Sequence, residues 1–220
     1  MLPTAESTAL KTHSPIPEER YVQAEARTTE AFEAIKSQNP WIESVPFKAQ
    51  AIAQENASQR SKFRKFVLLA ERINEAVAPH AQCAAGCSAC CRISVSLTTL
   101  EAQAIGHAIG VPPARPAKVF LATELDDWET EKMRFFGKPC PFLEGNHCGI
   151  YANRPVACKT HANLGDAFFC STEVPPEEST VSNLDLRGFY LMMTGVLLDS
   201  PVADIRDFFP SGLQSSKNEV

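Results

Sequence analysis

The chain has 220 residues, a formal net charge of −5, 44% hydrophobic residues and 21% charged residues. These values are typical of a globular chain with one ordinary domain, or one domain with an extension. The absence of a basic excess argues against a nucleic-acid interface and against binding to an anionic membrane. The first residues lack the basic and apolar regions of a secretory signal. The longest apolar run, residues 189–198, is about half of the roughly 20 residues that a membrane-spanning helix needs.

We therefore expect a cytoplasmic protein with no nucleic-acid or membrane partner. The sequence is compatible with a protein partner, which it does not identify. This compartment decides how the eight cysteines are interpreted. Thiols stay reduced in the cytoplasm, so a cluster of cysteines there indicates metal binding more often than disulfides.

The first 80 residues divide into a polar tail and a helical region. Residues 1–17 are rich in proline and polar residues and are predicted to be disordered. Over residues 18–80, the pattern predicts a helix at 18–37 and one longer helix from Pro46 to Ala78. The longer helix has an apolar face with helical spacing, made of Phe63, Phe66, Val67, Ala70, Ile73 and Val77.

Residues 81–172 are predicted to form the cysteine-rich domain. A short strand at 94–97 leads into a capping box, in which Thr98 caps a helix and Glu101 reaches back to the cap. That helix should end at Gly110. A second helix is expected at 114–136, and a hairpin at 139–151 that turns at residues 144–146.

The remainder, residues 173–210, should hold C-terminal helices at 184–198 and 202–208, followed by a polar tail at 211–220. The predicted fold class is mostly α. Helices flank a small cysteine-rich core that binds metal and contains a short hairpin.

The cysteines occur in two stretches of sequence. The first stretch places thiols three and four residues apart, and its small residues, with Gly86, allow the tight turn that would bring sulfurs to one centre. The second stretch spaces its thiols more widely. All eight are candidate metal ligands: Cys83, Cys87, Cys90, Cys91, Cys140, Cys148, Cys158 and Cys170. Soft thiolate ligands suit Zn²⁺ or an iron–sulfur cluster, and not magnesium or calcium.

Three arrangements fit this number of thiols: one centre with ligands from both stretches, two centres of four thiolates, or one bridged dinuclear centre. Cys90 and Cys91 are adjacent, and neighbouring side chains usually diverge. We therefore do not expect both to bind the same ion as terminal ligands. Four histidines flank the cysteines and are candidate ligands or hydrogen-bond donors to sulfur: His80, His107, His147 and His161. His161 is the strongest of these because it follows Cys158 by three residues.

The sequence from Cys140 to Lys159 reads CPFLEGNHCGIYANRPVACK, and CSACC precedes it at residues 87–91. These motifs resemble the CxxCxxCC family, also called YkgJ-like, a putative zinc- or iron-chelating domain. The resemblance extends from Cys83 to Cys170 and implies zinc or iron held by cysteine. One relative of this domain forms part of a flagellin lysine N-methylase, which is thought to use an iron–sulfur centre and S-adenosylmethionine. This chain departs from the family in having Lys159 where an arginine commonly follows the cysteine.

Three functions follow from these observations. The favoured one is a metal-binding protein that holds an iron–sulfur cluster, with 4Fe–4S as one form. The alternatives are an enzyme similar to the methylase, and a zinc module with a purely structural role. The C-x-x-x-C-x-x-C spacing and the paired cysteines favour iron, since a simple zinc ribbon has two separated C-x-x-C motifs.

The same spacing serves radical enzymes that cleave S-adenosylmethionine, but this sequence has no repeated β–α units for their barrel. Nor does it have a Gly-rich fingerprint for binding S-adenosylmethionine. Arg154 is expected to offset thiolate charge or to pair with Glu101.

Overall fold

The computed structural model describes residues 16–83, 86–121 and 133–213. Most of the predicted tails, and the middle of the helix predicted at 114–136, lie outside these residues. Within them the protein is mostly helical, and its strands form only small antiparallel pairs. This confirms the predicted fold class. None of the described helices has the length and apolar character needed to cross a membrane.

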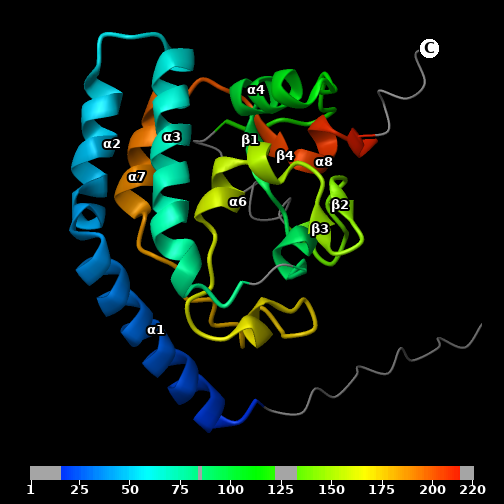
Figure 1. Cartoon of the computed structure of the whole chain (residues 1–220). Coiled ribbons are helices and arrows are strands. Elements are labelled where there is room, and N and C mark those ends of the chain that lie inside the picture. Colours follow the sequence, from blue (N-terminus) through cyan, green and yellow to red (C-terminus); the bar gives the residue numbers. More distant parts are fainter. Residues whose placement is uncertain (1–15, 84–85, 122–132, 214–220) are drawn as a thin grey trace, which may run out of the picture.

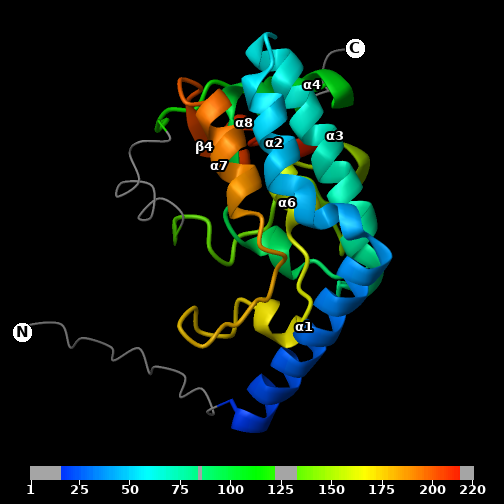
Figure 2. The ribbon, with the colours of Figure 1, turned by 90° about the vertical axis from the view of Figure 1, so that its left-hand side faces the viewer.

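A layer of helices forms one side of the molecule (Figures 1 and 2). α1 (Glu18–Gln38) is followed by α2 (Val45–Gln54) and α3 (Gln59–Val77), and α7 (Arg187–Val196) packs against both α2 and α3. The prediction of one helix from Pro46 to Ala78 was wrong. The chain leaves the helix at Glu55, which has an extended backbone, and starts again at Ser58, whose hydroxyl accepts a hydrogen bond from the Ser61 N–H. A serine at this position is a favourable N-cap, so it can begin a second helix.

The apolar face predicted on α3 forms the main core. Phe63, Phe66, Ala70, Ile73 and Val77 are buried there, and Val67 packs against them partly buried. The ring of Phe66 meets that of Phe189 on α7 edge-on, with the centroids 5.6 Å apart. This core holds α3 in place, and α6 (Val156–Thr160), which carries Cys158, packs on α3.

The other side of the molecule is built around a strand pair that joins distant segments. β1 (Ser96–Thr98) pairs with β4 (Val202–Asp204), with Leu97 opposite Ala203. The helix predicted at 202–208 is therefore this strand followed by the short α8 (Ile205–Phe208). α4 (Thr99–Ile109) begins and ends as predicted. The Thr98 side chain caps it, and Gly110 leaves it with a left-handed φ of 72°.

The prediction of a helix at 114–136 was wrong for the first part of this range, which the structure describes as far as residue 121. Residues 114–121 are not helical, and Phe120 pairs instead with Val202. Pro116 explains this difference, because it lacks a backbone N–H and disfavours the α conformation at the residue before it.

The predicted hairpin is present as β2 (Leu143–Glu144) and β3 (His147–Cys148), which turn at Gly145. Three short 3-10 turns complete this half: η3 (Ala89–Arg92), η4 (Tyr151–Asn153) and η5 (Ala167–Cys170). Two others, η1 (Pro40–Ser44) and η2 (Ala78–His80), pack in the helical layer. A second core forms here around Leu97, Phe142, Ile205 and Phe209, and it lies directly beneath several cysteines.

Candidate metal centre

The cysteines lie on separate short elements of the second half. Cys90 and Cys91 are on η3, Cys148 is on β3, Cys158 is on α6 and Cys170 ends η5. All eight are free thiols; Cys83 and Cys87 are exposed, and the other six are partly buried. Within residues 16–83, 86–121 and 133–213, no three cysteine, histidine or acidic side chains converge closely enough to form a ready metal site.

Backbone contacts bring the segment of Cys91 against that of Cys140. The Cys140 N–H donates to the Cys91 carbonyl at 2.7 Å. Arg206 on α8 then fixes both segments, because its guanidinium donates to the carbonyls of Cys91 at 3.3 Å and Pro139 at 3.2 Å. It also reaches the Ile93 carbonyl at 3.2 Å and the Lys138 carbonyl at 2.6 Å. Arg206 therefore acts as a clamp for these two cysteines.

The clamp is itself held by a buried ion pair. Arg206 Nη1 lies 3.0 Å from Asp204 Oδ1, and both side chains are almost inaccessible to solvent. The other carboxylate oxygen of Asp204 accepts from the Val95 N–H at 2.9 Å. A buried charge of this kind requires partners. Apart from Arg206, the Asp204 carboxylate finds one in Val95, which lies between the first cysteine stretch and β1.

Two sulfurs of the hairpin region accept backbone hydrogen bonds. Burial raises the pKa of the Cys140 thiol, and a hydrogen bond from the Phe142 N–H to its sulfur opposes that rise. Cys148 repeats the arrangement: burial raises its pKa, and the Ile150 N–H donates to its sulfur. Each donor is two residues after its cysteine. Hydrogen bonds to sulfur favour the thiolate and adjust the properties of a thiolate-bound metal.

Asn163 does the same for two cysteines from different stretches. Its side-chain Nδ2 lies 3.2 Å from Cys170 Sγ, and its backbone N–H donates to the sulfur of Cys83. Asn163 is fully buried, and its carbonyl accepts from the Gln82 N–H at 2.7 Å. One residue thus ties the chain around Cys83 to that around Cys170.

The thiols of Cys90 and Cys91 interact directly. The hydrogen bond between them raises the pKa of Cys90 far above its ordinary value and lowers that of Cys91. The structure therefore corrects the expectation that these neighbouring side chains diverge. The 3-10 turn at residues 89–92 brings them to one side, whereas an extended strand would separate them.

Arg154 supplies positive charge to the thiols. It counteracts the rise in pKa that the Cys91 hydrogen bond causes at Cys90 and that burial causes at Cys83 and Cys148. Its guanidinium donates to Asn74 Oδ1 at 2.7 Å and lies 4.1 Å from the centre of the Tyr151 ring. The expected role in offsetting thiolate charge agrees with this position. The expected pairing with Glu101 is replaced by the bond to Asn74.

Glu101 has another partner than the one predicted. Its carboxylate accepts from the Val156 N–H at 2.8 Å, at the start of α6, although a capping box would turn it back to its own helix. Burial raises the pKa of Glu101 to about 7, while the Val156 hydrogen bond and the charge of Lys159 oppose the rise. Lys159 is itself buried, and its ammonium donates to Glu71 and to the Ala152 carbonyl, both at 3.0 Å.

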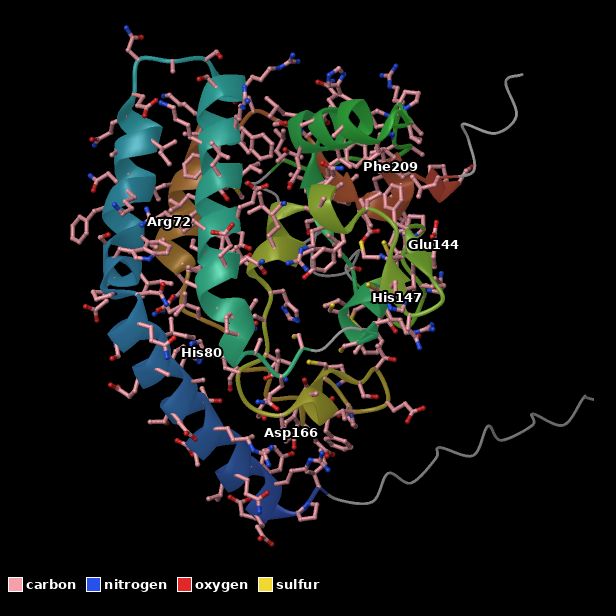
Figure 3. The ribbon with its side chains drawn as sticks, viewed as in Figure 1. Arg72, His80, Glu144, His147, Asp166 and Phe209 are labelled. Atoms are coloured by element: carbon pink, nitrogen blue, oxygen red, sulfur yellow. The ribbon has the colours of Figure 1, made fainter. Side chains whose placement is uncertain are left out.

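The four candidate histidines occupy different positions. His161 lines an open pocket of about 320 Å³ together with Cys90 and Cys170, and burial lowers its pKa. His80, at the foot of α3, has a buried Nε2 with no hydrogen-bond partner among the described residues. His147 is exposed on the hairpin beside Glu144 (Figure 3), and His107 is exposed in the last turn of α4. Of the four, His161 is therefore the one placed beside two cysteines.

Asn163 and Arg206 were not found from the sequence. Neither lies in a ligand-like spacing, and Arg206 follows the last cysteine in a segment predicted to be an ordinary helix. Only the pairing of β1 with β4 brings it to the cysteines. An Asn two residues from a predicted histidine ligand is a weak signal that could have drawn attention to Asn163.

The fold and site describe an α-rich protein with a compact cysteine-rich domain between helical flanks. Residues 82–177 match the family model CxxCxxCC, described as a putative zinc- or iron-chelating domain. This match covers the segment whose motifs resemble the family, in agreement with that prediction. No curated protein and no solved structure matches the chain.

Proposed function

We propose that this protein holds an iron–sulfur cluster through its clustered cysteine thiolates. The observation that carries the proposal is the set of donors directed at sulfur: the N–H groups of Phe142, Ile150 and Asn163, and the side chain of Asn163. A free thiol has little need of such donors, whereas a metal-bound thiolate retains negative charge and is stabilised by them.

Charge and burial support the same conclusion. Cys140, Cys148 and Cys158 pack against the apolar core around Phe142 and Ile150, which limits the access of water. The charge of Arg206 acts on the sulfur of Cys140 and that of Arg154 on the sulfur of Cys148. A cluster bound by several thiolates is an anion that needs such compensation.

Iron is preferred to zinc because of the number and spacing of the ligands. A structural zinc ion needs four ligands, usually from two separated C-x-x-C pairs. This domain offers eight thiols, three of them in C-x-x-x-C-x-x-C spacing. In this proposal the protein works in the reducing cytoplasm, in electron transfer, sensing or iron storage, together with a protein partner.

A second candidate is an enzyme that uses the cluster, with methyl transfer to a protein side chain as its most concrete form. It is favoured by the open pocket beside Cys90 and Cys170, whose walls include Phe169 and Val174 and whose polar groups include His161. An apolar pocket with a few polar groups is a typical ligand site.

The test is purification without oxygen, followed by an absorption spectrum and analysis of iron, zinc and acid-labile sulfide. A brown protein with a broad visible band and matching iron and sulfide supports the proposal. A colourless protein with stoichiometric zinc overturns it in favour of a structural zinc module. Binding of S-adenosylmethionine to the iron-loaded protein, measured by calorimetry, then separates the enzymatic candidate from the others.

A further inference from the structure

The contacts of the eight cysteines sort them into two sets that do not follow the two stretches of the sequence, although no three of these described side chains converge on one point. We define the inner quartet as Cys91, Cys140, Cys148 and Cys158, and the outer quartet as Cys83, Cys87, Cys90 and Cys170. Each quartet combines cysteines from both stretches of the sequence.

The inner quartet is assembled on the second core. The Cys140 N–H bonds to the Cys91 carbonyl, and Arg206 clamps both segments. The hairpin then brings Cys148 next to the Cys140 segment, since the Gly149 N–H donates to the Phe142 carbonyl at 2.8 Å. Cys140, Cys148 and Cys158 all pack against the same apolar cluster.

Electrostatic interactions place the four thiols of the inner quartet near one another, with Cys90 of the outer quartet beside them. Burial first, and then the neighbouring thiols Cys90, Cys140 and Cys148, raise the pKa of Cys158. After its hydrogen bond with Cys90 and its burial, Cys91 also responds to Cys140, Cys148 and Cys158. Such mutual effects require the sulfurs to lie near one another.

The outer quartet is assembled around Asn163 and the open pocket. Asn163 bonds to the sulfurs of Cys83 and Cys170, and Cys90 and Cys170 line the same pocket wall. Burial raises the pKa of Cys170, and after it the charges of Cys83, Cys87 and Cys90 do the same.

The two quartets meet at the Cys90–Cys91 hydrogen bond. Cys90 lies close to members of both quartets, to Cys83 and Cys170 of the outer one and to Cys91, Cys148 and Cys158 of the inner one. Cysteines close together in sequence can serve different centres: in two-cluster ferredoxins the fourth cysteine of a short run ligates the other cluster.

We propose that the domain contains two neighbouring metal centres, one held by the inner quartet and one by the outer quartet. This inference rests on the proposed function in needing thiolate-bound metal, but it adds the number of centres and the assignment of each ligand. Each centre would take a 4Fe–4S cluster or, with zinc, one tetrahedral ion. The outer centre is the one that faces the pocket, and the inner centre is enclosed by the core.

The first test is the metal content of the unmodified chain, purified without oxygen, which requires no variant. Two clusters give about eight irons and about eight sulfides per chain, and one gives about four. With zinc the corresponding numbers are about two and about one. A count of about eight irons supports both proposals. About two zinc ions overturns the iron assignment and keeps the two centres, and one cluster or one ion per chain overturns the two centres and leaves metal binding intact.

The ligand assignment is tested with two double variants, Cys83→Ser with Cys170→Ser for the outer quartet and Cys140→Ser with Cys158→Ser for the inner one. Each should retain about half of the iron and sulfide. Ser88→Ala, between Cys87 and Cys90, is the matched control and should keep the full content. If one pair removes all iron while the other removes none, the domain has a single centre and the inference is wrong.

Electron paramagnetic resonance of the dithionite-reduced protein provides a measurement that does not depend on yield. Two neighbouring clusters should give a signal broadened by spin coupling, and each double variant should give a simple signal from one cluster. A simple signal in the unmodified protein that is unchanged in one of the variants would contradict the assignment. Circular dichroism confirms that the variants retain the helical fold.

Discussion

The carboxylate of Glu101 on α4 accepts a hydrogen bond of 2.8 Å from the backbone N–H of Val156, the first residue of α6. This contact ties the helix that follows the first cysteine stretch to the helix that carries Cys158. It also satisfies one of the free N–H groups at the start of α6. Glu101 is buried to achieve it, and Lys159 supplies the nearest opposing charge.

The first prediction concerns the pH dependence of stability. Because burial raises the pKa of Glu101 from 4.5 to about 7, the folded state favours the protonated carboxyl. The stability that the protonated Glu101 side chain gives to the folded state is present in full below about pH 4.5 and is lost as the pH rises through about 7. The neutral variant Glu101→Gln should therefore gain relative stability with rising pH, by up to about 3 kcal/mol at pH 8.

The measurement is the difference in melting temperature between wild type and Glu101→Gln at pH 5, 6, 7 and 8, since other titrating groups cancel in the difference. The carbonyl oxygen of glutamine can still accept from the Val156 N–H. A difference that stays constant across this range would show that Glu101 titrates normally.

The second prediction concerns the Arg206 clamp. Replacing Arg206 with glutamine removes its bonds to the carbonyls near Cys91 and Cys140 and leaves Asp204 buried without its partner. We expect a loss of about 3–5 kcal/mol in the free energy of unfolding, measured with urea. Arg187→Gln, which affects an exposed ion pair with Asp185, is the control and should leave unfolding unchanged.

The third prediction concerns Asn163, which donates to Cys170 and also to the Asp166 carbonyl at 2.6 Å. Asn163→Asp keeps the shape of the side chain but places a negative charge beside a thiolate. It should lose more metal than Asn163→Ala, which only removes the donors. The readout is the metal released to a chelator over time. Equal release from wild type and Asn163→Asp would mean that the sulfur of Cys170 carries no negative charge in the loaded protein.

A fourth prediction tests the charge of Arg154. Arg154→Gln should release metal several-fold faster than wild type, while Arg154→Lys should lie in between, because lysine keeps the charge but loses the bond to Asn74 and the stacking on Tyr151. Raising the salt concentration should reduce the difference between the variants. If Arg154→Gln and Arg154→Lys behaved alike, the role of this residue would be packing and not charge.

Single alanine replacements of Cys87, Cys90, Cys148 and Cys158 form the fifth prediction. Each should lower the bound metal and the yield of folded protein, because a missing thiolate weakens its centre. Full metal content in all four variants would remove the basis for the ligand set. Cys90 should have the widest effect, since it contacts members of both quartets.

The sequence was informative where local chemistry decides the structure. The cap at Thr98, the stop at Gly110, the turn at Gly145 and the buried face of α3 follow from short patterns, and the structure contains all of them. It was misleading where distant segments compete. Residues 202–204 have a helical pattern but form a strand because Ser96–Thr98 offers a partner for their backbone groups. Glu101 stays in α4, but its carboxylate turns away from the cap of this helix and accepts from the Val156 N–H.

The same limit applies to the candidate site. Cysteine spacing predicted the eight thiols as candidate ligands, but the grouping that we propose depends on Arg206 and Asn163, whose importance comes from tertiary contacts. Local spacing also suggested that Cys90 and Cys91 would point apart, and the 3-10 turn at 89–92 overturned that expectation.

The position of Arg206 also has a consequence for the order of events during synthesis. The family match ends at residue 177, yet the clamp on Cys91 and Cys140 comes from α8, which the ribosome produces later. A nascent chain that has already exposed all eight cysteines still lacks the arginine that holds two of them together. We therefore expect metal loading to follow the completion of the chain, and a fragment ending at residue 177 should acquire metal poorly even though it contains every candidate ligand.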